Sequence, residues 1–418
     1  MNLIIRNARI IEQNNPLNNQ VTDLQIANGK IEKIGTQLPN SGDYQEITFD
    51  NLHVSKGWFD TSVSFGEPGF EDRETISNGL KVAGKSGFTG VALQPNNQPV
   101  LDNQAQIYFV KQKAQNTTTE LFPIGALTKN SAGTDLAELL DMKNAGAIAF
   151  GDYNKSLDNA NLLKVALQYT QDFGAKVIAF AMDNHIKGKG IVNEGIVSTQ
   201  LGLKGIASLA EDLMVSRNLY ILEYTGGKLH IPTLSTAQSV ALVREAKAKG
   251  LQVSCSVSVH HLVLTDAVLT TFDSNYRLMP PLRTEADRQS LIAGVLDGTI
   301  DCITSDHNPM DVENKNLEFD LAKNGTIGLE SAFSALQTVL PTEVIIEKLT
   351  AGRQVFELDD HSIQEGEVAN LTLFTPKGEW TFSLENIASK SKNSAFLGST
   401  MKGKVYGSIN NNQFIHNN

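Results

Sequence analysis

Short runs of apolar residues recur along the middle of the chain, and helical or loop stretches separate them. The eight runs are His53–Phe59, Phe88–Leu93, Leu121–Ala126, Ala147–Phe150, Val177–Ala181, Lys228–Ile231, Leu251–Val257 and Ile300–Thr304. In the run from Leu251 apolar and polar residues alternate, as in a half-buried β-strand. One intervening helix is clear, because Thr236 can cap its start and Gly250 can end it. Eight strands alternating with helices over about 300 residues predict a (β/α)8 barrel of the TIM type.

The two ends of the chain have a different pattern. Residues 1–52 and 360–418 contain short β runs separated by turns, and neither stretch is long enough for a core of its own. We therefore expect both ends to pair into one small β-sandwich domain. Residues 53–359 are expected to form the barrel beside it.

Composition excludes several classes of function. The chain carries 35 Lys and Arg against 46 Asp and Glu, a formal net charge of −11. That charge argues against nucleic acid as a partner, because phosphate binding needs clustered cations. No apolar run approaches the ~20 residues of a membrane helix, and the first residues lack the apolar core of a signal peptide. We expect a cytoplasmic protein in which Cys255 and Cys302 are free, buried thiols.

A series of motifs follows in a fixed order along almost the whole chain. They include Gly57-Trp58-Phe59-Asp60, Glu67-Pro68-Gly69, Pro95-Asn96-Asn97-Gln98-Pro99, Asn193-Glu194-Gly195, His260-His261-Leu262, Pro280-Pro281-Leu282-Arg283 and Ser305-Asp306-His307-Asn308-Pro309. In this order the chain resembles the dihydroorotase branch of the amidohydrolase superfamily, which is close to allantoinases and hydantoinases. The resemblance implies a barrel flanked by a β-domain from both chain ends. It also implies hydrolysis of a cyclic amide with one or two divalent metals, usually zinc.

The positions at which this family holds its metals carry other residues here. The family's histidine ligands correspond to Ser62, Ser64, Phe180 and Thr233. Side chains two residues apart on a strand point to the same face, so Ser62 and Ser64 would both face the position of one metal ion. A hydroxyl group that stays protonated is nevertheless a poor zinc ligand. Asp306 keeps the position of the family's metal-bound, proton-shuttling aspartate.

The family's substrate contacts are also changed. Gly66 stands where the resemblance implies an arginine that binds the substrate carboxylate, and Met279 and Met310 stand in place of an asparagine and a histidine. Loss of the guanidinium removes a two-point contact with an anion. Asn96 keeps the position of a substrate-contacting asparagine.

Few other residues are available as metal ligands. Asp152 lies where some members have a bridging carboxylate and others a carboxylated lysine, although Tyr153 could instead correspond to that ligand. His260 and His261 are expected at a strand end, where adjacent side chains point to opposite faces and cannot both bind one metal ion. The resemblance implies that this pair serves packing and hydrogen bonding. His185 is expected to be a solvated loop residue.

The leading hypothesis is a pseudo-dihydroorotase, with no cofactor expected and no hydrolase activity. It would act as a scaffold or regulatory subunit of de novo pyrimidine biosynthesis and form homo-oligomers. Inactive relatives of dihydroorotase scaffold aspartate transcarbamoylase, so that enzyme or another of the pathway is the expected partner, by analogy of fold.

Two alternatives stay open. The first is an active, zinc-dependent cyclic amidohydrolase whose rebuilt single-metal site uses Asp306, Asp152 and His185. The second is a sensor that binds a small molecule in the emptied barrel mouth.

Overall fold

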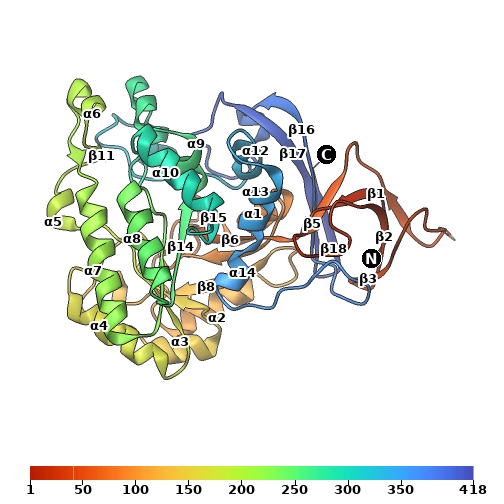
Figure 1. Ribbon diagram of the computed structural model, residues 1–418, viewed down its shortest axis with the longest axis horizontal. Helices are drawn as coiled ribbons and strands as arrows, with labels where there is room; N and C mark the ends of the chain where they lie inside the picture. Colours follow the sequence, from red (N-terminus) through yellow and green to blue (C-terminus); the bar gives the residue numbers. More distant parts are fainter. Residues whose placement is uncertain (41, 418) are drawn as a thin grey trace.

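The computed structural model describes residues 1–40 and 42–417 and contains a β/α barrel beside a sheet built from both chain ends (Figure 1). Each barrel strand pairs in parallel with the next. The strands are β6 (Trp58–Val63), β7 (Phe88–Leu93), β8 (Glu120–Gly125), β9 (Ala149–Phe150), β10 (Lys176–Ile178), β13 (Lys228–Ile231), β14 (Val253–Ser258) and β15 (Cys302–Thr304). Beyond the last strand, the Ser64 N–H donates to the His307 carbonyl at 2.7 Å, which joins the last strand to the first. The predicted barrel is confirmed.

Helices surround the barrel strands. The longer ones are α1 (Ile76–Lys85), α2 (Gln104–Lys113), α3 (Leu139–Ala145), α4 (Ala160–Gln171), α7 (Leu209–Thr225), α8 (Ala237–Ala248), α10 (Glu285–Leu296) and α13 (Thr342–Thr350). The shorter ones are α5 (Asn184–Lys187), α6 (Ile196–Leu201), α9 (Val259–Val263), α11 (Val312–Lys315), α12 (Ala332–Leu336) and α14 (Gly352–Val355). Thr236 caps α8 as predicted, because its hydroxyl accepts from the Ser239 N–H.

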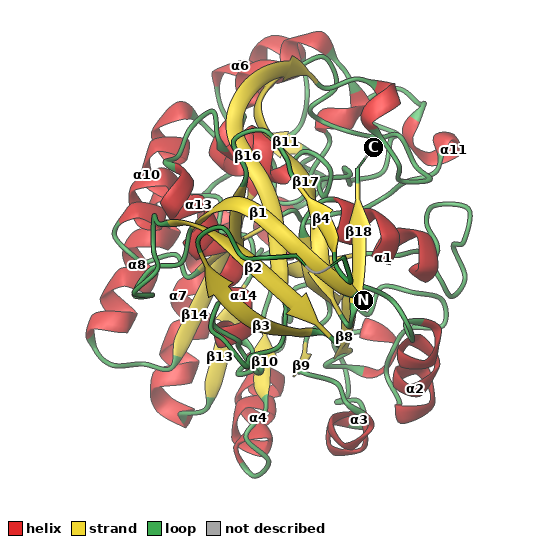
Figure 2. Ribbon diagram, turned by 90° about the vertical axis from the view of Figure 1, so that its right-hand side faces the viewer, coloured by secondary structure: helices red, strands yellow, loops and turns green. Residues whose placement is uncertain are grey.

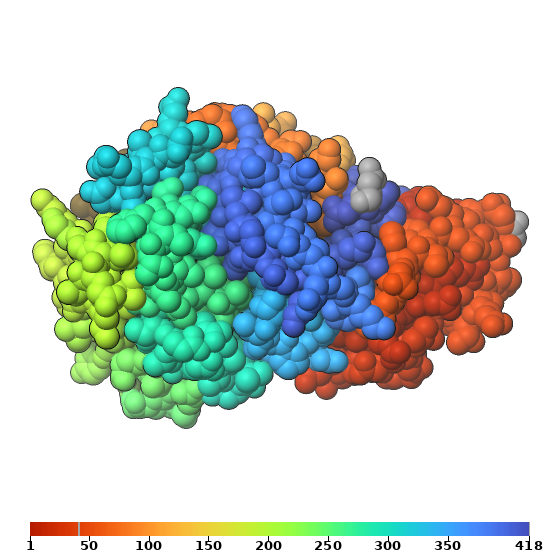
Figure 3. All heavy atoms as spheres, turned by 90° about the horizontal axis from the view of Figure 1, so that it is seen from above, coloured from red at the N-terminus to blue at the C-terminus, as the bar shows by residue number. Residues whose placement is uncertain are grey.

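The two chain ends form one mixed sheet of eight strands, seen face-on in Figure 2. Its members are β1 (Asn2–Ile10), β2 (Val21–Ala27), β3 (Lys30–Gly35), β4 (Gln45–Ile47), β5 (His53–Lys56), β16 (Leu371–Thr381), β17 (Thr400–Asn410) and β18 (Gln413–His416). β5 joins the halves, since it pairs with both β1 and β16. In the space-filling view the N-terminal segment lies beside the C-terminal one, at the end of the molecule away from helices α4 to α7 (Figure 3).

The run predicted as the first barrel strand divides at Gly57. His53–Lys56 belongs to the end sheet and the barrel strand starts at Trp58, so the change of sheet falls four residues after the predicted position. A Cβ at Gly57 would lie 2.0 Å from Thr89 Oγ1 and 1.9 Å from Asn370 Oδ1. Only glycine lets the chain cross between the sheets at this close approach.

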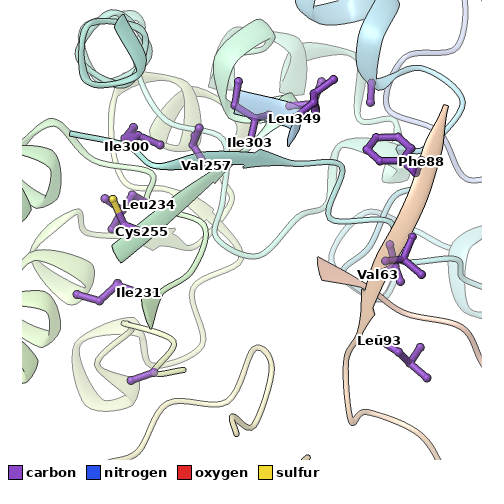
Figure 4. Packing of buried hydrophobic residues seen from close by; sticks show 14 of the residues in the cluster. Val63, Phe88, Leu93, Ile231, Leu234, Cys255, Val257, Ile300, Ile303 and Leu349 are labelled. Atoms are coloured by element: carbon purple, nitrogen blue, oxygen red, sulfur yellow. The ribbon is translucent and has the colours of Figure 1, made fainter. Parts of the chain in front are cut away.

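The main hydrophobic core fills the space between the strands and the helices. Figure 4 shows part of it, with Val257 and Ile303 from neighbouring strands close to Leu349 of α13. Cys255 and Cys302 are buried and free, as predicted. A separate cluster that includes Ile5, Leu24 and Leu371 covers the end sheet. Within residues 1–40 and 42–417, no helix has the length and apolar character that crossing a membrane requires.

A hydrogen-bonded barrel mouth as the candidate functional site

Polar side chains from three barrel strands meet at the mouth of the barrel. Ser62 lies on β6, Tyr153 follows β9, and Asp306 follows β15. The Ser62 hydroxyl donates to Asp306 Oδ1 at 3.0 Å, and the Tyr153 hydroxyl donates to the same oxygen at 3.3 Å. Catalytic groups of TIM barrels sit at this end of the strands, so the Ser62–Asp306–Tyr153 network is the candidate site.

Two further polar residues extend this network. The Gln94 side-chain amide donates to Ser62 Oγ at 3.1 Å, and the Ser64 hydroxyl donates to Asn96 Oδ1 at 3.1 Å. Asn96, which the resemblance places at a substrate-contacting position, therefore accepts a hydrogen bond from a residue of its own chain. The hydroxyl groups of Ser62 and Ser64 both have acceptors within the mouth, which leaves neither of them free as a donor.

Burial changes the acid–base properties of the network. It raises the pKa of Asp306 to about 7, helped by the nearby Asp60 charge and opposed by the hydrogen bonds from Ser62 and Tyr153. Burial, and then the charge of Asp306, raise the pKa of Tyr153 well above its usual range. Asp306 can therefore exchange a proton near neutrality. The groups that touch it are hydroxyls that stay protonated at that pH.

Asp152 and Tyr153 occupy different environments. Asp152 is buried and accepts hydrogen bonds from the backbone N–H groups of Leu127 and Thr128, at 3.0 and 3.1 Å. It anchors the loop after β8 and does not join the network. Tyr153, held at a φ of +53°, reaches Asp306 instead. The structure thus places Tyr153 at the mouth, where sequence reasoning left the choice between the two residues open.

Apolar side chains form one wall of the mouth. Phe180, Met182 and Met279 are buried together in a small cluster, and at Phe180 and Met279 the family resemblance implies polar residues. Thr233 is buried nearby on its own strand end with a φ of +50°, and its side-chain oxygen has no protein partner. Met310 is half-buried, and its N–H donates to Asn393.

Gly66 leaves no room for a side chain in the present loop. A Cβ at this position would lie 1.9 Å from the Phe70 carbonyl oxygen, and the Phe70 N–H donates to the Gly66 carbonyl at 2.7 Å. An arginine at position 66 would require the turn over residues 66–70 to move. The backbone of this turn therefore accommodates only glycine at position 66.

The histidines lie outside the network. His260 and His261 are on helix α9 and not on a strand end, so the predicted geometry was wrong. His261 Nδ1 lies 2.6 Å from Ser258 Oγ, whereas neither ring nitrogen of His260 has a protein partner. His185 is exposed on α5, as expected of a solvated loop residue. Among the described residues, no three His, Cys, Asp or Glu side chains are grouped as a metal site requires.

Replacing Asp306 with asparagine should stabilise the metal-free protein at alkaline pH. An aspartate with a folded pKa of about 7 and an unfolded pKa of about 3.9 contributes stability that is complete below pH 4 and lost as the pH rises through 7. In EDTA, urea unfolding at pH 8 should show a gain on the order of 2–4 kcal/mol for Asp306→Asn, which falls to about 1 kcal/mol or less at pH 4.5.

The matched control is Asp297→Asn. Although partial burial opposes the shift, hydrogen bonds from Thr299 and the ion pair with Arg244 lower the pKa of Asp297. Its substitution should destabilise the protein at pH 8. An Asp306→Asn variant that is less stable than the parent at pH 8 would contradict the account of this network.

The chain is similar to known proteins over its whole length. Residues 53–239 match the family model described as "Dihydro-orotase-like". Proteins named "Dihydroorotase" from Geotalea daltonii and Caldicellulosiruptor saccharolyticus are 37% and 38% identical, over 100% and 99% of this chain and 99% and 98% of theirs. The fold matches an L-hydantoinase (dihydropyrimidinase) from Arthrobacter aurescens with a TM-score of 0.87 and 18% identity, covering 99% of this chain and 96% of that one. A dihydropyrimidinase from Brevibacillus agri matches with a TM-score of 0.82 and 18% identity, covering 100% of this chain and 95% of that one.

The comparisons overturn the expectation that no cofactor belongs to this protein. Dihydroorotases and hydantoinases depend on metal, usually zinc, and this chain aligns with dihydroorotases from end to end. The expectation rested on the absent histidines alone, and the family finding carries more weight. Zinc is therefore the cofactor that membership of the family implies.

The side chains at the barrel mouth do not fit a zinc ion held in the family's way. The groups at the mouth are the carboxylate of Asp306 and the hydroxyls of Ser62, Ser64 and Tyr153. They already hydrogen-bond to one another or to Gln94 and Asn96. Zinc prefers thiolate, imidazole and carboxylate ligands in a tetrahedral arrangement. The side chains at the mouth therefore do not match the ligands that zinc prefers, and they define no catalytic step through zinc.

The likeness to the relatives nonetheless extends along the whole chain. At the mouth, the motif residues Asp306 and Asn96 accept hydrogen bonds from Ser62 and Ser64. Identity of 37% extends over the full length of this chain and nearly that of the relative. The chain belongs to the dihydroorotase family.

Proposed function

We propose that this protein serves de novo pyrimidine biosynthesis in the cytoplasm as a scaffold or regulatory subunit, without hydrolysing dihydroorotate. The observation that carries the proposal is the network in which Ser62 and Tyr153 donate to Asp306. A hydrolase of this family needs an activated water molecule next to its aspartate. Here hydroxyl groups of the chain occupy both hydrogen bonds to Asp306 Oδ1.

The substrate side of the mouth supports the same proposal. A cyclic amide that carries a carboxylate needs charged or polar partners, because a buried polar group without a hydrogen bond costs about 1–3 kcal/mol. At the three positions where the family resemblance implies substrate contacts, Met279 and Met310 offer no such partner, and Gly66 has no side chain and no room for one. The residues that would bind such a substrate and those that would attack it are altered together.

The proposed partner is aspartate transcarbamoylase, and the outer face of α7 is the surface suited to docking. Tyr220 and Tyr224 are each 75% exposed, and Leu209 and Leu213 lie on the same face of the helix. Tyrosines are enriched in interface cores, and clustered exposed apolar residues mark interaction sites. Homo-oligomers of this chain are part of the proposal and could use the same face.

Size-exclusion chromatography of the chain with the aspartate transcarbamoylase of the same organism tests the scaffold role. We expect a shared peak that the Tyr220→Asp/Tyr224→Asp double variant loses. Tyr108→Asp, on the exposed side of α2, is the control and should keep the complex. Separate elution of the two proteins at micromolar concentration would sink the scaffold proposal.

A second candidate is an active, zinc-dependent cyclic amidohydrolase. It is favoured by the name of the relatives, "Dihydroorotase", and by the pKa of about 7 at Asp306, which suits a group that moves protons at neutral pH. Under this candidate Asp306→Ala abolishes a measurable turnover by zinc-loaded protein. Under the leading proposal the variant and the parent give the same background rate.

A further inference from the structure

A cavity of about 330 Å³ opens at the barrel mouth beside the Ser62–Asp306–Tyr153 network. Its apolar wall consists of Phe180, Met182, Met279 and Met310. None of the three network residues lines it. The cavity is at the lower end of the size of small-molecule sites, which are mostly apolar with a few placed polar groups.

The rim of the cavity is positive. Arg73, Lys187 and Lys323 line it, and no carboxylate side chain does. Arg73 is paired with Asp311 at 2.9 Å. Among the ion pairs of residues 1–40 and 42–417, none involves Lys187 or Lys323. Two cations without acidic partners thus border a cavity with one apolar wall, on an otherwise acidic protein.

This combination selects one kind of ligand. A methionine-rich wall adapts to apolar groups of varied shape, because its thioether chains are flexible and polarisable. This wall itself has no hydrogen-bonding group for a polar ring, and the polar part of the lining comes from Asn154, Asn184 and Asn324 together with the cations. Lysines at the rim attract an anionic head group, and that attraction weakens with added salt.

We propose that this cavity binds a small amphiphilic carboxylate, whose hydrocarbon body lies against Phe180, Met182 and Met279 and whose head group pairs with Lys187 and Lys323. The inference goes beyond the proposed scaffold role and holds whether or not the chain binds a partner. The two lysines come from different segments, α5 and the loop after α11, so a bound carboxylate would tie the two segments together.

Isothermal titration calorimetry of the full chain with octanoate tests the inference. We expect one site with a Kd on the order of 0.1 mM that weakens as the salt concentration rises. Octyltrimethylammonium, with the same chain and the opposite charge, should bind at least tenfold more weakly. Dihydroorotate, which is anionic but lacks the hydrocarbon body, should also bind at least tenfold more weakly.

Matched variants separate this cavity from other surfaces. Lys187→Glu/Lys323→Glu should weaken octanoate binding at least tenfold, whereas Lys189→Glu/Lys204→Glu, which changes two exposed lysines outside the cavity, should leave it within twofold. Met310→Asn, at the half-buried edge, should weaken it without loss of folding, as checked by circular dichroism. The absence of octanoate binding, equal binding of the ammonium, or equal losses in both double variants would overturn the proposal.

Discussion

Acidification from pH 7.5 to pH 5 is expected to remove about 2 kcal/mol of stability for each of four buried histidines. His230, His260 and His307 have their pKa lowered to about 3, and His261 to about 4, first by burial. In the unfolded chain each would take up a proton near pH 6.5. The unfolded state therefore binds more protons below that pH, and the stability is lost as the pH falls from 6.5 toward the folded values.

His260 offers the cleanest test of this effect, because neither of its ring nitrogens has a protein partner. In His260→Met, urea unfolding should show a loss between pH 7.5 and pH 5 that is smaller than the parent's by roughly 2 kcal/mol. His185→Met, which removes an exposed histidine, is the control for the substitution itself. Buried carboxyl groups with a raised pKa, Asp306 among them, act in the opposite direction in all three proteins. Identical pH dependence in His260→Met and the parent would refute the prediction.

Arg283→Met is expected to destabilise the protein by about 3–5 kcal/mol, because it leaves a buried charge without its partner. The Arg283 guanidinium is almost fully buried and donates to Asn193 Oδ1 at 3.0 Å and to the Ile206 carbonyl at 2.8 Å. Its other end lies 3.9 Å from the Glu211 carboxylate, which is buried as well. Removing both charges avoids much of this loss of stability, because neither charge is then buried without its partner.

Chemical denaturation of four variants measures the effect. Glu211→Gln/Arg283→Met should recover part of the loss seen in Arg283→Met, since no unpaired charge is left. Arg244→Met, which breaks the half-exposed pair with Asp297, should cost less than about 1 kcal/mol. Glu211→Gln alone completes the cycle. Equal losses in Arg283→Met and Arg244→Met would show that the buried pair has no special role.

Much of the fold followed from apolar periodicity. All eight predicted runs overlap a barrel strand, because strands buried on both faces leave a clear apolar signal. The boundary at Gly57 could not be read in this way, since β5 and β6 form one continuous run in the sequence. Their separation depends on contacts with Thr89 and Asn370, which are distant along the chain.

The candidate site was only partly predictable. The positions of Ser62, Ser64 and Asp306 followed from the order of the motifs, but their mutual contacts arise from closure of the barrel between β6 and β15. Tyr153 left no signal beyond its place next to Asp152, because its direction depends on a positive φ. The lysines at the rim of the cavity come from separate loops, and no spacing rule connects such loops.

The initial rate of dihydroorotate hydrolysis by the purified, zinc-supplemented protein tests the central claim most directly. The account predicts a rate equal to the background without enzyme, and the same rate for Asp306→Ala. A dihydroorotase from one of the relatives, assayed in the same buffer, shows that the assay can detect turnover. A turnover well above background that Asp306→Ala abolishes would contradict the account and establish an active dihydroorotase with a rebuilt site.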